Sequence, residues 1–164
     1  MHKIIKAIIE QLEAELATAL SASQEAHRSA THSENVADNK YDTLAVEAAY
    51  LAHGQSLRIE QLQKAIHLYT HFVVPAFNQQ SSVEVGALLK LESIGEGVKD
   101  AVQLRHVFLG PAEGGLSVKL GKLTVQVLTT EAPLGEALLN KLVDDEFDLS
   151  LGGKKLSFRI LNIQ

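Results

Sequence analysis

The stretch Pro133-Leu134-Gly135-Glu136-Ala137-Leu138-Leu139-Asn140-Lys141-Leu142 lies between two strand-like segments, in the half of the chain that is rich in turn residues. Its proline stands where the first turn of a helix tolerates one, and three of its leucines follow at helical spacing. The stretch therefore predicts a short helix that packs on a sheet. Such an arrangement makes this half of the chain an α+β domain.

Five segments around this helix alternate between apolar and polar residues, as half-buried strands do. The expected strands cover residues 83–91, 102–109, 123–128, 147–151 and 156–161. The last two flank Gly152-Gly153, a dipeptide that favours a two-residue hairpin turn. We therefore expect a small antiparallel sheet with the short helix on one face.

The composition changes near residue 75. Residues 1–74 contain one glycine and no proline, whereas residues 75–164 contain ten of the eleven glycines and all three prolines. The composition of the first part is typical of helices, and that of the second part is typical of a sheet with many turns. We expect an antiparallel helical hairpin, or coiled coil, over residues 1–74, a linker over 75–82 and the α+β domain over 83–164.

Apolar and small residues recur in the first half with the spacing of a heptad seam. One seam contains Ile5, Ile9, Leu12, Leu16, Ala19, Ser23, Ala26 and Ala30, and the other contains Leu44, Ala48, Leu51, Ile59, Leu62, Ile66, Tyr69 and Val73. The large residues of both seams lie far from the polar connection at residues 29–40. The pattern predicts a long hairpin that is wide at its base and slim at its tip.

Composition excludes several classes of function. The chain has no cysteine, so disulfides, cysteine-ligated zinc and thiol catalysis are excluded. Fifteen Lys and Arg against twenty Asp and Glu give a net charge of −5, which argues against binding nucleic acid by bulk charge. No apolar run reaches the roughly 18 residues of a membrane helix, and acidic residues soon follow the N-terminus. We expect a cytoplasmic protein.

The stretch 132–141, followed by Asp144-Asp145-Glu146-Phe147, resembles the C-terminal signature of the bacterial Gre transcript-cleavage factors. That signature reads Ser-Pro-Leu/Ile, a small residue, any residue and Ala-Leu-Leu-Gly-Lys, followed by Gly-Asp-Glu-aliphatic, a Gly-Gly turn and a final aromatic-x-Ile strand. Gly152-Gly153 and Phe158-Arg159-Ile160 supply the last two features. Here Ala132 replaces the family's Ser, and Asn140 and Asp144 replace its two glycines.

The resemblance covers the whole chain, because the family also has an N-terminal antiparallel coiled coil followed by an FKBP-like domain. It implies that the coiled coil enters the secondary channel of bacterial RNA polymerase and stimulates cleavage of backtracked RNA. The polymerase's own active site would perform that hydrolysis, so this chain would not itself be an enzyme. We expect a monomer with no cofactor of its own, no membrane contact and no sequence-specific contact to nucleic acid.

In the family, acidic side chains at the tip of the coiled coil help to hold a catalytic Mg²⁺ and orient water. Glu34-Asn35 matches the family's Glu-Asn pair. The family's preceding Asp position is occupied by Thr31, and Tyr41 follows the pair by six residues where the family has a Tyr after three. The match at the tip is therefore partial.

Glu34, Asp38 and Asp42 are spaced four residues apart and share one face if that segment is helical. Carboxylate oxygens are ligands that Mg²⁺ prefers, so we predict these three acids as the catalytic and metal-binding residues, with the Mg²⁺ shared with the polymerase. The alternative is that they are solvated tip residues, with Asp38 or Asp42 capping the second helix.

Two other functions stay open. Thr31 in place of the family's Asp favours a protein that occupies the same channel without cleavage, as an inhibitor or competitor of Gre factors. A stand-alone interaction module, similar to the regulators of nucleoside diphosphate kinase, is the other; the long hairpin argues against it. His67 and His71 have metal-ligand spacing, but with no third ligand evident we interpret them as helix surface. Residues 110–115 are interpreted as a turn rather than a phosphate loop.

Overall fold

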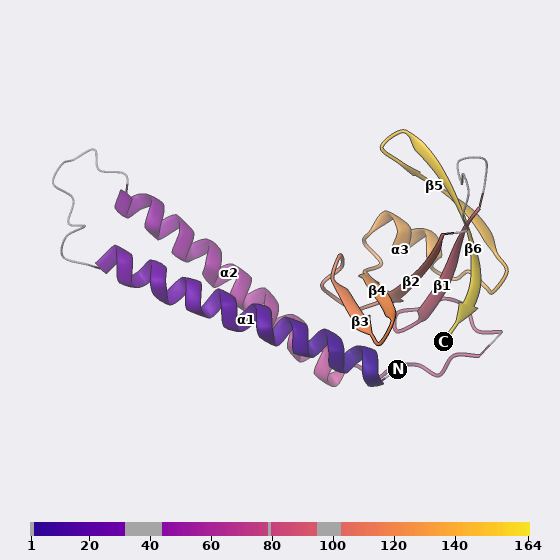
Figure 1. Cartoon of the computed structure of the whole chain (residues 1–164), viewed down its shortest axis with the longest axis horizontal. Helices are drawn as coiled ribbons and strands as arrows, with labels where there is room; N and C mark the ends of the chain where they lie inside the picture. Colours follow the sequence, from indigo (N-terminus) through magenta and orange to yellow (C-terminus); the bar gives the residue numbers. More distant parts are fainter. Residues whose placement is uncertain (1, 32–43, 79, 95–102) are drawn as a thin grey trace. The chain divides into compact units, whose positions relative to one another are not determined.

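The computed structural model describes residues 2–31, 44–78, 80–94 and 103–164 (Figure 1). In these ranges it has three helices and six strands. The helices are α1 (His2–Thr31), α2 (Leu44–His71) and α3 (Pro133–Leu138). The strands are β1 (Leu88–Ile94), β2 (Leu104–Leu109), β3 (Ser117–Leu120), β4 (Leu123–Leu128), β5 (Glu146–Leu151) and β6 (Lys154–Ile163). The α+β class predicted from the sequence is confirmed.

The six strands form one sheet in the order β3-β4-β2-β1-β6-β5. Four of the strand pairs among the described residues are antiparallel, but β2 and β4 are parallel. The expectation of a purely antiparallel sheet is therefore wrong at this pair. The cause is β3, which occupies the sheet edge, so that the β3–β4 hairpin returns β4 to the position beside β2.

Two expected boundaries are corrected by backbone conformation. The strand expected over residues 83–91 begins at Leu88, because Gly86 has φ +104° and the Ala87 N–H donates to the Glu84 carbonyl in a turn. β3 was not expected from the sequence, because its four residues are too few to give a clear alternation. The short helix ends at Leu138, and Asn140 then takes φ +62°.

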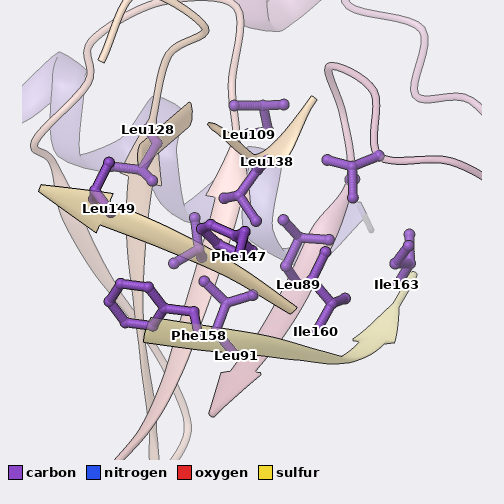
Figure 2. Close-up of a cluster of buried hydrophobic side chains, with 13 residues drawn as sticks. Leu89, Leu91, Leu109, Leu128, Leu138, Phe147, Leu149, Phe158, Ile160 and Ile163 are labelled. Atoms are coloured by element: carbon purple, nitrogen blue, oxygen red, sulfur yellow. The ribbon is translucent and has the colours of Figure 1, made fainter. Parts of the chain in front are cut away.

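The main core lies on one face of the sheet (Figure 2). Its members are the buried residues Val83, Ala87, Leu89, Leu91, Val107, Leu109, Leu128, Leu138, Phe147, Leu149, Phe158, Ile160 and Ile163. Leu138 comes from α3, so the short helix packs against this face as predicted. Burial of each large side chain here contributes about 1.5–3 kcal/mol to stability relative to exposure.

The opposite face is also buried where β2, β4 and β3 meet. Phe108 points away from the main core, because its neighbours on the strand belong to that core and successive residues point to opposite faces. Phe108 pairs with Val127, and Val118 pairs with Val125. All four side chains are buried. This end of the sheet is therefore covered on both sides.

The chain divides into two compact units, one formed by Ile9–His67 and the other by Met1–Ile8 with Leu68–Gln164. The helical unit contains the antiparallel central parts of α1 and α2, which are joined by an ion pair between Glu15 and Arg58 at 3.0 Å. The other unit, called here the globular unit, contains the sheet, α3 and the base of both helices. The predicted division at residues 74 and 83 stays a prediction.

The seam residues Leu12, Ala19, Leu62 and Tyr69 are buried as predicted. At the start of α1, however, the fully buried residues are Ile4 and Ile8, where the seam had placed their neighbours Ile5 and Ile9. The predictions for Leu51 and Val73 are wrong, because these side chains are 64% and 85% exposed. Val73 lies beyond the end of α2, where the helical period no longer applies.

The left-handed backbone at Asn140 predicts an unusual mutational pattern. The exchange Asn140→Ala should lower the free energy of unfolding by about 1 kcal/mol, because a Cβ without a local hydrogen-bonding group is disfavoured at positive φ. Asn140→Gly should leave stability within about 0.5 kcal/mol of the wild type. Chemical denaturation measures both values.

The exposed residue Lys122, which has an ordinary backbone conformation, supplies the control. Lys122→Ala should be close to neutral. An Asn140→Gly variant that is clearly less stable than Asn140→Ala would contradict the backbone explanation.

Candidate functional site

The three acids predicted at the tip, Glu34, Asp38 and Asp42, lie outside the described residues. The described part of α1 reaches Thr31 and that of α2 starts at Leu44, so in the sequence the three acids fall between these two residues. Within the described residues there is no group of three or more His, Asp or Glu side chains that could hold a metal ion. The role of the tip acids stays a prediction.

The helices on either side of this connection are long. At a rise of about 1.5 Å per residue, the 30 residues of α1 correspond to about 45 Å and the 28 residues of α2 to about 42 Å. Neither they nor the short α3 has a stretch long and apolar enough to cross a membrane, as far as the described residues go.

A shallow groove runs along the helical unit between the two helices. It has a volume of about 460 Å³ and is lined by Gln11, Ala14, Glu15, Thr18, Ala19, Ala22, Gln55, Arg58 and Leu62. The groove exists because several side chains that line it on α1 are small. Glu15 and Arg58, which also line it, form an ion pair in which each side chain is 39% exposed. An ion pair exposed to this extent contributes about 1 kcal/mol or less to stability.

The base of α2 is fixed inside the globular unit by Tyr69. Its side chain is only 1% exposed, and its hydroxyl donates a hydrogen bond of 2.7 Å to the carbonyl of Ala112. Burial raises the pKa of the Tyr69 hydroxyl above its ordinary value, and the backbone hydrogen bond opposes that shift without cancelling it. The group therefore stays a neutral donor.

Gly110 makes room for this tyrosine. A Cβ atom at Gly110 would lie 2.2 Å from the Tyr69 hydroxyl oxygen and 3.0 Å from the Val127 side chain. Gly86 plays a similar part nearby, since a Cβ there would lie 2.8 Å from Pro75 and 3.2 Å from Phe72. Both glycines thus let the chain that leaves α2 approach the sheet closely. Gly110 and Ala112 therefore form a socket for Tyr69.

Backbone geometry explains the residue types at three positions of the stretch that resembles the Gre signature. Asn140 and Asp144 have φ values of +62° and +69°, a region that favours glycine and, among other residues, Asn and Asp. These are the two positions at which the Gre pattern has glycine. Gly135 stands at the pattern's small residue, and a Cβ there would lie 2.0 Å from the Thr129 carbonyl oxygen.

Hydrogen bonds hold this stretch against the rest of the globular unit. The N–H of Asn140 donates to the Val83 carbonyl, and the N–H of Val83 donates to the Lys141 carbonyl. The Asp145 carboxylate accepts the N–H of Leu142 at 2.8 Å. These residues support turns and strand pairing, so their role in the structure is architectural.

Charged residues on β1, β5 and β6 form ion pairs on the face opposite the main core. Arg159 pairs with Glu146 and, at 3.7 Å, with Glu92. Asp148 accepts a hydrogen bond from Ser157 at 2.6 Å and pairs with Lys155 at 2.9 Å. The Lys155 and Ser157 hydrogen bonds lower the pKa of the Asp148 carboxyl, and the Glu146 hydrogen bond raises the pKa of Arg159.

The histidines singled out by spacing, His67 and His71, are exposed on α2. Tyr69, which lies between them in the sequence, is the residue of this segment that contacts the globular unit's turn. Its seam position indicated burial only. The glycine-proline pair that follows β2 was the available signal for a close approach at this turn.

No protein-family model matches the chain, and no curated protein matches it. Similar solved structures include GreA factor homolog 1 (Gfh1) of Thermus thermophilus, with 21% identity, a TM-score of 0.39 and coverage of 95% of this chain and 94% of that chain. Gfh1 of Thermus aquaticus has 22% identity, a TM-score of 0.37 and coverage of 96% and 94%. The elongation factor GreA/GreB from Nitrosomonas europaea has 19% identity, a TM-score of 0.37 and coverage of 62% and 78%.

Because these identities are below 25% and the TM-scores are below 0.5, the likenesses decide neither the fold nor the function.

The Tyr69 socket predicts a non-additive pair of substitutions. Gly110→Ala should lower the free energy of unfolding by about 2 kcal/mol, because its Cβ collides with the tyrosine hydroxyl. Tyr69→Phe alone should cost about 1 kcal/mol for the lost hydrogen bond. In the Tyr69→Phe background Gly110→Ala should cost clearly less, since the colliding oxygen is gone. A double-mutant cycle from chemical denaturation measures the difference.

Gly54 is the matched control, because it lies in α2 with no atom within 4 Å of a Cβ. Gly54→Ala should raise stability by up to about 1 kcal/mol. Strict additivity of the Tyr69 and Gly110 substitutions would show that the socket is described incorrectly.

Proposed function

We propose that the chain is a transcription elongation regulator that binds bacterial RNA polymerase at its secondary channel and stimulates cleavage of backtracked RNA. The observation that carries the proposal is the backbone of residues 133–147. Its two left-handed residues and its close-packed glycine fall on the glycine and small-residue positions of the Gre signature. A match between this chain and the signature at positions that require a particular backbone conformation is more specific than a similarity in amino-acid composition.

The helices support the same proposal. Two antiparallel helices of about 45 and 42 Å present a connection that contains three carboxylates. In the helical unit the residues of α1 change from Leu12 to Ala19 and Ala22 toward that connection, so the side chains become smaller. A slim acidic end suits a narrow channel that leads to a metal-dependent active site.

In this proposal the polymerase performs the hydrolysis. The Mg²⁺ belongs to the polymerase active site, and it would activate water and stabilise the in-line displacement at the RNA phosphate. Glu34, Asp38 and Asp42 would contribute carboxylates that help to hold it. The chain has no catalytic centre of its own in this account, and it works in the cytoplasm, where the polymerase is found.

Insertion of the hairpin predicts that the connection is needed for polymerase binding. Replacing residues 24–47 by a four-residue Gly-Ser turn should lower affinity for core polymerase at least tenfold, because the inserted end is lost. Co-sedimentation or fluorescence anisotropy measures the affinity, and circular dichroism checks that the shortened chain folds. Unchanged affinity in a folded variant would exclude insertion of this part.

The role of the three tip acids is tested by removing their negative charges while keeping the size of the side chains. In the triple variant Glu34→Gln, Asp38→Asn and Asp42→Asn, release of 3′ RNA fragments from backtracked complexes should slow at least tenfold. Polymerase affinity should stay within about twofold, because amides keep the size of the side chains. The measurement is the rate of fragment release at saturating protein.

The matched control removes three exposed carboxylates outside residues 24–47, by Glu13→Gln, Glu131→Gln and Glu136→Gln. It should cleave like the wild type. Equal loss in both triple variants would point to net charge and would contradict a specific role for the tip.

A second candidate is supported by one residue. Thr31, the last residue of α1, stands where the Gre pattern has an acidic side chain. A chain that lacks this carboxylate could occupy the channel and inhibit the polymerase without cleavage. In that case the triple exchange at the tip would leave inhibition unchanged, whereas the shortened hairpin would abolish it.

A further inference from the structure

Two cations lie over two aromatic rings on the face of the sheet that carries the main core. The guanidinium carbon of Arg105 is 5.7 Å from the centroid of the Phe158 ring, and the Nζ of Lys141 is 5.6 Å from the centroid of the Phe147 ring. The two rings themselves contact each other, with centroids 5.6 Å apart and planes tilted by 30°. Figure 2 shows both rings within the buried cluster. One aromatic pair thus carries a cation on each ring.

Strand register places these groups on one face. Arg105 lies opposite Leu91 on β1, and Leu91 lies opposite Ile160 on β6. Both of these apolar partners belong to the main core. Paired residues of neighbouring strands point to the same face, so the side chain of Arg105 belongs to that face. Lys141 reaches it from the segment after α3, where its N–H donates to the Leu138 carbonyl.

The carboxylates of β5 point the other way. Glu146 and Asp148 flank Phe147 in the strand, so they lie on the opposite face and pair there with Arg159 and Lys155. The negative charge of Asp144 also contributes to raising the pKa of Arg159. Within the described ranges, neither Arg105 nor Lys141 has a carboxylate within ion-pair distance. The positive charge on the core-side face is therefore not neutralised by these neighbours.

The rings hold the two cations in position. Attraction between a cation and the face of an aromatic ring restricts the side chain and leaves its N–H groups available. Arg105 is exposed and Lys141 is half-buried, so both can be reached from solvent. A guanidinium fork matches a carboxylate in two parallel hydrogen bonds. Side chains that are already restricted lose less entropy when a partner binds.

We propose that Arg105 and Lys141 form a docking surface for an acidic polypeptide segment. The surface favours carboxylates over nucleic acid, because Phe158 and Phe147 are only 1% and 9% exposed and offer no ring for base stacking. This surface lies in the globular unit and is independent of the tip residues and of the polymerase proposal.

The test uses the full chain labelled with ¹⁵N and a ten-residue oligoglutamate peptide as the probe. At 50 mM salt the peptide should shift the Arg105 side-chain resonance and the amide resonances near residues 105, 141, 147 and 158. The double exchange Arg105→Gln with Lys141→Gln should weaken the apparent affinity at least fivefold. A ten-residue oligouridylate should give smaller shifts at the same positions.

The matched control is Lys119→Gln with Lys122→Gln, which removes two exposed lysines from β3 and the turn that follows it. This variant should bind the peptide like the wild type. Equal weakening in both double variants, absence of shifts near Arg105 in the wild type, or tighter binding of oligouridylate would each overturn the proposal. Because the wild-type shifts are measured directly, the result does not depend on the stability of the variants.

Discussion

The hydrogen bond from the Tyr69 hydroxyl to the Ala112 carbonyl is the contact on which the connection between helix and sheet depends. It joins the last turns of α2 to the segment that follows β2, and it lies against a glycine that leaves no space for a Cβ. Because Gly86 and Gly110 have no Cβ, the chain that leaves α2 can come close to the sheet at two positions. Tyr69 packs at Gly110, and Phe72 and Pro75 pack at Gly86. The base of the helices is thereby part of the globular unit.

Close backbone approach and unusual backbone conformation also determine the structure of residues 133–147. Gly135 approaches the Thr129 carbonyl, and the left-handed residues Asn140 and Asp144 reverse the chain before β5. Glycine is the usual choice at positive φ, and Asn and Asp are the residues that replace it at least cost. Asn140 and Asp144 therefore hold, at low cost, a backbone conformation that glycine would also adopt. The chain reversal before β5 depends on these two residues.

Much of the fold follows from local patterns. Proline at the start of α3, the Gly152-Gly153 turn and the alternation in β4 each specify an element by themselves, and the structure has all three. The pattern fails where tertiary contacts decide. β3 has only four residues, and its place at the sheet edge, which makes β2 and β4 parallel, is set by pairing with β4.

The candidate site was less predictable than the fold. Helical periodicity indicates that Tyr69 is buried, but it contains no information about Ala112, which lies on another element. Cations over Phe147 and Phe158 likewise depend on register between β2, β1 and β6. For the tip, spacing places three carboxylates in one short connection and leaves their mutual geometry open, since that geometry depends on how the connection turns.

We propose that this chain acts on RNA polymerase that has backtracked. The most direct measurement is RNA fragment release from stalled, backtracked elongation complexes in Mg²⁺, with and without the purified full chain. We expect that saturating protein accelerates release of short 3′ fragments and that the protein co-elutes with the polymerase. An unchanged rate together with no co-elution would contradict the claim.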